Sequence, residues 1–442
     1  MRVKGLLFGA LVVVLLATAA PAGPVLMISL DGLRPADVLQ AKKRGLNLPN
    51  LTALINEGTY ASGVRDALPS VTYPNHTSLV TGVWPARHGI FNNTIFDPNG
   101  VEMQAWYWYA SDIKVPTLWD AVHEAHGKVA SVSWPVSVGS LSIDYNLPEY
   151  WRAATAEDLK LLTALSTPGL VARIEKETGL PRGALFGSDQ QHDSARARYA
   201  EKMYEDFSPE FMSVHLVSLD HLQHGYGPGS PEAHKALESL DADVGKLVAV
   251  ARKVHPDVTV AIVSDHGFAA ISKLVNLGSA FVDAGLVTLK DGKLASWDAM
   301  PWNAGGSSMV VLAHPEDQAV KDKVAALLNK LAADPENGIA KVIDKAGIDA
   351  RGGSGKASFW VDYKIGYASG SAMTGPLVTS SGTLKGTHGY FPEDKEMRAT
   401  FIIVGPGIKK KNLGEIEMID IAPTLAKIME VPFPSASGKL LF

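Results

Sequence analysis

Side chains of the kinds that bind metal ions follow short apolar runs at four separated places in this 442-residue sequence. The segments are LMISLDG, VHLVSLDHLQH, VAIVSDHG and GTHGY, and they carry Asp31, Asp220, His224, Asp265, His266 and His388. Between the first two lies SVTYPNHTSLVTG, which adds the hydroxyl of Thr72. Three carboxylates, three imidazoles and one hydroxyl suit two hard-to-borderline divalent cations, and zinc fits this mixture best. The inventory predicts an enzyme with a two-metal site.

The spacing within two of these segments supports the metal interpretation. Asp265 and His266 are adjacent and enter a glycine turn, so both can bend toward one ion, although the same residues also suit a solvated turn. Asp220 and His224 are four residues apart, which places them on one face of a helical turn. Neighbouring His221 is expected to lie at the surface or behind the ligands.

Thr72 has two compatible interpretations. A threonine hydroxyl is a poor nucleophile unless a base or a metal ion lowers its pKa, and no Ser-His-Asp order is evident in the sequence. Metal activation would make Thr72 the nucleophile. The other interpretation makes Thr72 the N-cap of a helix over NHTSLVTG. A helix amino terminus also favours an anion, so one role does not exclude the other.

Apolar runs alternate with amphipathic segments from Pro24 onward. VLMISL, EFMSVHLVSL, VTVAIVS and ATFIIVG have the continuous apolar character of strands that are buried on both faces. LPNLTALINEG and EAHKALESLDADVGKLVAVARKV have the periodicity of helices. This alternation predicts an α/β fold with a doubly wound, mostly parallel sheet. Ligands bind beyond the carboxyl ends of such strands, where we expect Asp31, Asp220 and Asp265.

The pattern changes between residues 271 and 384. This stretch contains SSMVVLAHPED, the helical QAVKDKVAALLNKLAAD and the β-rich SFWVDYKIGYAS, which together indicate a small α+β insert. We therefore expect a catalytic α/β domain over residues 23–270 and 385–442, with residues 271–384 as a cap over the site.

The amino terminus is typical of an export signal. MRVK precedes the apolar GLLFGALVVVLLATAA, and Ala20-Pro21-Ala22 is the best cleavage site, so residues 1–22 are expected to be a signal peptide. The apolar stretch is short of the ~20 residues that a spanning helix needs, so we expect no stable membrane span. The protein would then be secreted or periplasmic. The sequence has no cysteine, which excludes disulfides, and its net charge of -5 offers no basic field for a nucleic-acid polymer.

Several motifs occur together and in order along the chain: LDGLRP, LPNLTALINEG, TYPNHTSLVTG, RHGIFNN, LDHLQHGYGP, SDHGF, GTHGY and FIIVGPGIKK. In this combination the sequence resembles the nucleotide pyrophosphatase/phosphodiesterase family of the alkaline phosphatase superfamily. The resemblance implies an alkaline phosphatase-like fold and two zinc ions per chain. It assigns Asp31, Thr72, Asp265 and His266 to one zinc ion and Asp220, His224 and His388 to the other.

The resemblance also implies a mechanism. Thr72 would attack phosphorus to form a phospho-enzyme, which water then hydrolyses. Asn93, in HGIFNN, matches the asparagine that donates a hydrogen bond to a phosphoryl oxygen. Tyr73 matches the aromatic residue that can stack on a nucleobase. The expected substrate is a small phosphodiester of a nucleotide or another small alcohol.

The charges of this ligand set favour a diester over a monoester. Three carboxylates and a Thr72 alkoxide balance two divalent cations, and a neutral site tolerates the single charge of a diester more readily than the two charges of a monoester. Monoesterase relatives carry a Lys-x-Arg element, but the comparable stretch here is SVSWPVSVGS. A phosphomonoesterase or phosphonate hydrolase remains the alternative if Lys356 or Lys364 of the insert supplies a cation. A metal-stabilised binding protein is the non-enzymatic alternative.

Overall fold

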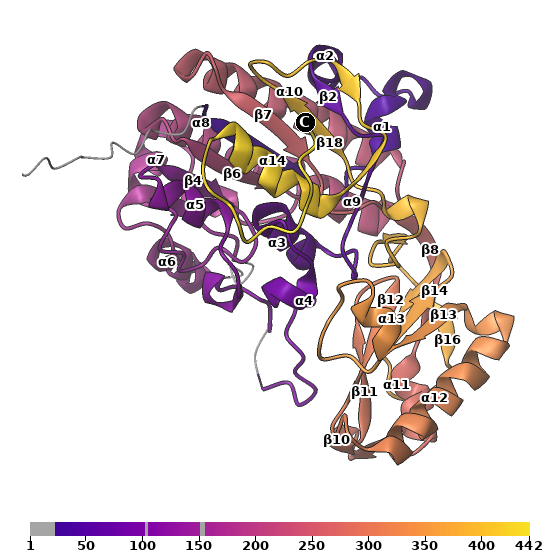
Figure 1. Cartoon of the computed structure of the whole chain (residues 1–442). Helices are drawn as coiled ribbons and strands as arrows, with labels where there is room; N and C mark the ends of the chain where they lie inside the picture. The colour runs from indigo at the N-terminus through magenta and orange to yellow at the C-terminus, as the bar shows by residue number, and fades with distance from the viewer. Residues whose placement is uncertain (1–22, 102–104, 151–154) are drawn as a thin grey trace, which may run out of the picture.

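An eight-stranded sheet forms the centre of the larger part of the molecule in the computed structural model, which describes residues 23–101, 105–150 and 155–442 (Figure 1). The strand order is β19-β2-β18-β7-β1-β6-β4-β5. These strands are β1 (Val25–Leu30), β2 (Thr59–Tyr60), β4 (Val129–Val132), β5 (Tyr145–Leu147), β6 (Phe211–Leu216), β7 (Thr259–Val263), β18 (Phe401–Val404) and β19 (Lys411–Asn412). The apolar runs singled out in the sequence supply β1, β6, β7 and β18.

The five strands from β7 to β5 are parallel, whereas β18 runs antiparallel to β7. The sequence gives no sign of this reversal. After β7 the chain passes through the smaller part and returns with β17 (Gly386–Thr387) and His388, at the carboxyl edge of the parallel strands. A strand that starts from that edge can pair directly only in the antiparallel direction, because a parallel partner needs a crossover.

Helices cover both faces of this sheet (Figure 1). Alternate side chains of β1 enter two different cores, with Leu26, Ile28 and Leu30 in one and Val25 and Met27 in the other. Helices α2 (Pro49–Glu57), α8 (Gln190–Phe207) and α10 (Pro231–Val254) supply the first core, and α3 (Thr72–Thr81), α5 (Leu118–Glu124) and α14 (Ile421–Ile428) supply the second. The remaining helices of the larger part are α1 (Pro35–Leu39), α4 (Pro85–His88), α6 (Ala156–Leu165), α7 (Leu170–Thr178) and α9 (Ser218–Tyr226).

The smaller part lies beside the sheet and is built from the segment between β7 and β18, drawn mainly in orange in Figure 1. One of its sheets has the order β11-β12-β14-β13, and a second is formed around β8 by β15, β16 and β17. Its strands are β8 (Ala269–Val275), β9 (Val287–Lys290), β10 (Lys293–Trp297), β11 (Ala299–Asn303), β12 (Ser307–Leu312), β13 (Ile339–Asp344), β14 (Phe359–Tyr363), β15 (Gly366–Ser369) and β16 (Val378–Ser380). Its helices are α11 (Leu277–Asp283), α12 (Gln318–Ala333) and α13 (Lys345–Asp349). The pair of β20 (Glu415–Glu417) with β3 (Gly63–Arg65) completes the strands of the described chain.

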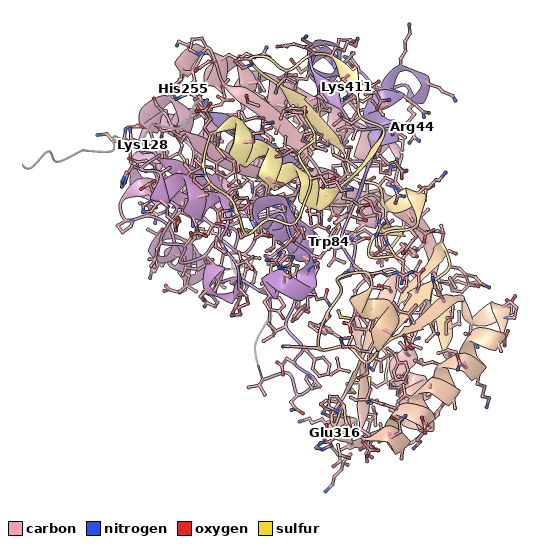
Figure 2. The ribbon with its side chains drawn as sticks, in the orientation of Figure 1. Arg44, Trp84, Lys128, His255, Glu316 and Lys411 are labelled. Carbon is pink, nitrogen blue, oxygen red and sulfur yellow. The ribbon has the colours of Figure 1, made fainter. Side chains whose placement is uncertain are left out.

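One contact between the two parts lies at the start of α4, where Figure 2 labels Trp84, the N-cap of this helix, whereas the labelled Glu316 lies at the far end of the smaller part. Gly352 lies directly against Trp84, and its carbonyl oxygen accepts a hydrogen bond from the Ala86 N–H at 2.9 Å. A Cβ at position 352 would lie 2.5 Å from the Trp84 Cβ, and the positive φ of 64° also favours glycine. This contact fixes the smaller part next to the segment that follows α3. Within the described ranges, no helix combines the length and the apolar character needed to cross a bilayer.

Candidate metal centre and nucleophile

The three candidate carboxylates lie at the carboxyl edge of adjacent parallel strands. Asp31 directly follows β1, Asp265 follows β7, and Asp220 lies in the first turn of α9 after β6. Because β1 pairs with both β6 and β7, these strand ends meet at one edge of the sheet. The chain thus brings together three side chains that are far apart in the sequence.

A first cluster forms around the Nε2 atom of His266. This atom is 3.0 Å from Asp265 Oδ2, 3.3 Å from Asp31 Oδ1 and 3.4 Å from Thr72 Oγ1. Ligands of a tetrahedral zinc ion at ~2.0 Å are separated from each other by about 3.3 Å, so these spacings are those of a tetrahedral ligand set. Asp31, Asp265 and His266 also form one of the described groups of side chains that could hold a metal ion.

A second cluster forms around Asp220. Its Oδ2 atom is 3.5 Å from His224 Nε2, and its Oδ1 atom is 3.6 Å from His388 Nε2. The ring of His388 stacks on that of His266 with a centroid distance of 3.6 Å, so the two clusters are adjacent. Asp193 holds the start of α9 in place, because its Oδ2 atom accepts the Ser218 N–H at 2.6 Å.

Backbone carbonyls fix the protonation of the three candidate imidazole ligands. The Nδ1 atoms of His224, His266 and His388 lie 2.9–3.0 Å from the carbonyl oxygens of Gly386, Gly267 and Ser70. A carbonyl oxygen only accepts hydrogen bonds, so each Nδ1 carries a hydrogen, and a ring that binds a cation in its neutral form would present the lone pair of Nε2. In every case Nε2 is the atom that faces the carboxylates. This arrangement fits three imidazole ligands for cations.

The surroundings of the three carboxylates also suit metal binding. Within the described residues, Asp31 Oδ1, Asp220 Oδ1 and Asp265 Oδ2 are buried and accept no hydrogen bond. Burial, together with the charges of Asp265 and Asp220, raises the pKa of the Asp31 carboxyl well above its ordinary value. Although burial opposes it, Asp265 and Asp31 raise the pKa of His266 to about 10. A site so crowded with acidic groups is stabilised when cations neutralise it.

Thr72 is the first residue of α3, and Val71 is the N-cap. The N-cap interpretation of Thr72 is therefore wrong, and no side chain among the described residues caps this helix. The hydroxyl instead points to the first cluster, where its oxygen lies 3.4 Å from His266 Nε2. Asn75 shapes the preceding loop, because it accepts the Ala67 N–H at 2.7 Å and donates to the carbonyl oxygens of Pro69 and Val71.

A cavity of about 290 Å³ opens over both clusters. Its lining residues are Asp31, Thr72, Tyr73, Asn93, Trp106, Glu149, Ser188, His215, Val217, Asp220, His221, His224 and His388. Asn93 accepts the Tyr73 N–H through its amide oxygen at 2.8 Å, which leaves its NH₂ group to donate toward a bound molecule. His221 is exposed, as expected, but it lies on the cavity wall.

The aromatic run before the site divides between the cavity and the core. Trp106 is half-buried and lines the cavity beside the buried Tyr73, with a ring-centroid distance of 5.0 Å. Tyr107 and Trp108 are buried in the core, whereas Tyr109 is half-exposed. Tyr145 stacks on Phe207 away from the cavity. Nothing in the local sequence separates Trp106 from its neighbours.

Two lining residues form a contact that the sequence does not indicate. His215 on β6 lies between Glu149 and Asp31, and all three side chains are buried. Although burial opposes it, the carboxylates of Glu149 and Asp31 raise the pKa of His215 well above its ordinary value. His215 lies within an apolar strand and Glu149 in an unremarkable loop, so only the fold reveals the contact.

Comparisons with known proteins agree on one family. The family model described as "Type I phosphodiesterase / nucleotide pyrophosphatase" matches residues 25–391. Ectonucleotide pyrophosphatase/phosphodiesterase family member 1 of Mus musculus is 30% identical over 253 residues, which cover 55% of this chain and 24% of that protein. Venom phosphodiesterase 2 of Crotalus adamanteus is 25% identical over 451 residues, which cover 96% of this chain and 48% of the venom protein. The chain thus spans half or less of the length of these two relatives.

Solved structures of the family share the fold. Human ectonucleotide pyrophosphatase/phosphodiesterase 5 superposes with a TM-score of 0.67 at 19% sequence identity, over 94% of this chain and 97% of that one. An inactive variant of the murine protein, solved in complex with AMP, gives the same TM-score at 18% identity, with the same shares of the two chains covered. At this level of identity the likeness establishes the alkaline phosphatase-like α/β fold.

Proposed function

The chain belongs to the type I phosphodiesterase/nucleotide pyrophosphatase family, and from this premise we propose that it hydrolyses phosphodiester or pyrophosphate bonds through a covalent phospho-threonine at Thr72. One observation carries the proposal. The Thr72 hydroxyl and two buried carboxylates all lie within 3.0–3.4 Å of His266 Nε2, at the spacing of ligands around one ion.

Two zinc ions are the cofactor that this side-chain chemistry favours. Asp31, Thr72, Asp265 and His266 would hold one ion, and Asp220, His224 and His388 the other. When bound, the ions supply positive charge that lowers the pKa of the Thr72 hydroxyl and stabilises charge on the phosphoryl group. The orphaned carboxylate oxygens and the aligned Nε2 atoms support this assignment.

Thr72 attacks phosphorus in the first step. A bond forms between Thr72 Oγ1 and phosphorus while the bond from phosphorus to the leaving oxygen breaks, and the leaving group departs with a proton. In the second step water attacks phosphorus from the side that the leaving group vacated, and Thr72 regains its hydroxyl hydrogen. Asn93 donates its NH₂ group to a phosphoryl oxygen and so holds the substrate in line.

Asn93→Ala is expected to reduce kcat/KM on the best diester by about 10²–10³-fold, because a donor to the developing phosphoryl charge is lost. Metal content should stay at the wild-type level, since Asn93 lies in neither ligand cluster. Steady-state kinetics together with metal analysis check both points. An unchanged kcat/KM would show that Asn93 does not stabilise the phosphoryl group.

The cavity favours a diester or pyrophosphate substrate over a monoester. Among its described lining residues there is no Lys or Arg to balance the second charge of a monoester. Lys364 donates to the Pro335 carbonyl oxygen, and Lys356 lines a separate depression on the smaller part. Neither candidate cation of the insert lines the site, which argues against the phosphomonoesterase or phosphonate hydrolase alternative.

The substrate class is tested with three chromogenic compounds. We expect thymidine 5′-p-nitrophenyl phosphate and bis-p-nitrophenyl phosphate to be hydrolysed at least about tenfold faster than p-nitrophenyl phosphate at equal concentration, because the protein-plus-metal charge sums to zero. A preference for the monoester would identify a phosphomonoesterase. Turnover of none of the three, with metal bound, would favour the binding-protein alternative.

A nucleotide is the substrate that the cavity walls favour, and the AMP complex of the murine neighbour is consistent with this choice. Trp106 and Tyr73 form an aromatic wall next to Asn93, and a nucleobase would stack on the half-buried Trp106 ring more readily than on the buried Tyr73 ring. Tyr73 therefore acts mainly by supporting Trp106.

We also propose that residues 271–384 form an insert that caps a doubly wound catalytic domain, made of residues 23–270 and 385–442. The insert supports the site, since the Asn303 carbonyl oxygen accepts from Asn92 Nδ2 at 2.9 Å and Asn92 Oδ1 accepts the Asn93 N–H. Residues 1–22 lie outside the described residues, and their role as a signal for secretion or export to the periplasm stays a prediction.

A further inference from the structure

A series of buried hydrogen bonds connects Glu149, which lines the cavity, to one candidate metal ligand, Asp31. Glu149 Oε2 lies 2.8 Å from His215 Nδ1, and His215 Nε2 lies 3.0 Å from Asp31 Oδ2. Glu149, His215 and Asp31 are 4%, 0% and 4% exposed, respectively. They come from three separate places in the sequence: the loop after β5, strand β6 and the end of β1.

We propose that His215 is a positioning residue that holds Asp31 Oδ2 and thereby turns Asp31 Oδ1 toward the metal ion; this inference rests on the metal binding in the proposed function. Asp31 Oδ1 is buried, accepts no hydrogen bond within the described residues and lies 3.3 Å from His266 Nε2. One oxygen is therefore held by the protein and the other is left for the cation. Such outer partners commonly fix the orientation of metal ligands.

The direction of the hydrogen bond to Asp31 follows from the partners. A metal-binding carboxylate only accepts hydrogen bonds, so Nε2–H of His215 donates to Asp31 Oδ2. On the other side of the ring, Nδ1 faces both Glu149 Oε2 and the Ser133 carbonyl oxygen, at 2.8 and 3.1 Å. These two acceptors prevent the ring from rotating, and so they keep Nε2 directed at Asp31.

Asp265 shows the same division between its two oxygens. Its Oδ1 atom accepts the Gly32 N–H at 3.2 Å, whereas its buried Oδ2 atom accepts no hydrogen bond from the described part of the chain and faces His266. The Gly32 amide donates a hydrogen bond to one oxygen of Asp265, just as the His215 side chain donates to one oxygen of Asp31. Only the second arrangement can be removed by a single substitution.

The position of the donor, rather than the volume of the ring, should decide metal affinity. The amide of asparagine at position 215 lies near the place of Nδ1, so His215→Asn keeps a polar contact with Glu149 but loses the donor to Asp31. The longer His215→Gln brings an amide NH₂ to the place of Nε2 and restores the donor. We expect one of the two zinc dissociation constants to rise about 10–100-fold in H215N, and H215Q to recover most of this loss.

Zinc affinity is measured by chelator competition on metal-free full-length protein, and the melting temperature of the same metal-free samples is recorded. His88→Asn is the matched control, because His88 is also fully buried and bonded to Ser78 Oγ at 3.2 Å but touches no candidate ligand. H88N should lower the melting temperature without changing either zinc constant. Equal zinc losses in H215N and H215Q, or none in either, would overturn the inference.

If H215N does not fold, His215→Ala is measured with and without added imidazole, which can occupy the place of the lost ring. Imidazole should tighten zinc binding in H215A and leave the wild type unchanged, and no tightening would overturn the inference. The proposed function fails separately: wild-type protein that binds no zinc contradicts the metal site itself. If the wild-type protein binds two zinc ions and H215N has the same zinc dissociation constants, only the proposed role of His215 is contradicted.

Discussion

Thr72→Ala is expected to lower turnover of the best diester by about 10⁴-fold or more, because removal of a catalytic nucleophile typically has an effect of this size. Metal content should largely survive the substitution. The other three proposed ligands, Asp31, Asp265 and His266, would still surround the first ion, since His266 Nε2 lies 3.3 Å from Asp31 Oδ1 and 3.0 Å from Asp265 Oδ2. Inductively coupled plasma analysis and steady-state kinetics on the same preparation measure both quantities.

Thr72→Ser is the control for this experiment. Serine keeps the hydroxyl and loses only a methyl group, so it should retain substantial activity, with a product burst if hydrolysis of the phospho-enzyme is slow. Near-native turnover in T72A would show that water attacks phosphorus directly. The assignment of the metal ligands would then be unaffected, whereas the assignment of Thr72 as the nucleophile would be wrong.

Asp265→Ala is expected to remove both activity and bound metal. Asp265 Oδ2 lies 3.0 Å from His266 Nε2 and is fully buried, so its loss takes one ligand from a tetrahedral set. His388→Ala should act in the same way on the second ion, because His388 Nε2 faces Asp220 Oδ1. Metal analysis should find fewer than two zinc ions per chain in each variant.

Asp241→Ala is the control for Asp265→Ala. It distinguishes the effect of losing a metal ligand from the effect of losing any buried aspartate. Asp241 is also buried, but it accepts the Leu51 N–H at 2.7 Å near the start of α2 and lies in neither ligand cluster. The D241A variant should be less stable than the wild-type protein but should still bind two zinc ions. Retention of both ions in D265A and H388A would contradict the assignment of these two residues.

The elements that carry the candidate ligands are predictable because the signals are local. Asp31 and Asp265 directly follow apolar runs that form β1 and β7, and the spacing of Asp220 and His224 is that of one helical face in α9. The orientation of β18 is not predictable from such signals, since its apolar run is the same in either direction. The position of Thr72 at the start of α3 rather than at its N-cap depends on Asn75, which shapes the loop before it.

The partners of the ligands are harder to predict than the ligands. His215 contacts Asp31, 184 residues away, and Glu149, 66 residues away. No periodicity or motif in the sequence predicts either contact. Trp106 and Trp108 are likewise equivalent in sequence, yet one lines the cavity and the other packs in the core. Long-range pairing of buried polar groups is a property of the folded chain and has no local signature.

The stereochemical course at phosphorus is the measurement that distinguishes a phospho-threonine intermediate from direct attack by water. A diester made chiral at phosphorus by sulfur substitution is hydrolysed by the wild-type protein in water enriched in heavy oxygen, so that the phosphorothioate product is itself chiral at phosphorus. The configuration of this product is then determined. Two successive in-line displacements, first by Thr72 Oγ1 and then by water, each invert the configuration at phosphorus, so we expect overall retention. Overall inversion would show a single attack by water and would contradict the phospho-threonine intermediate.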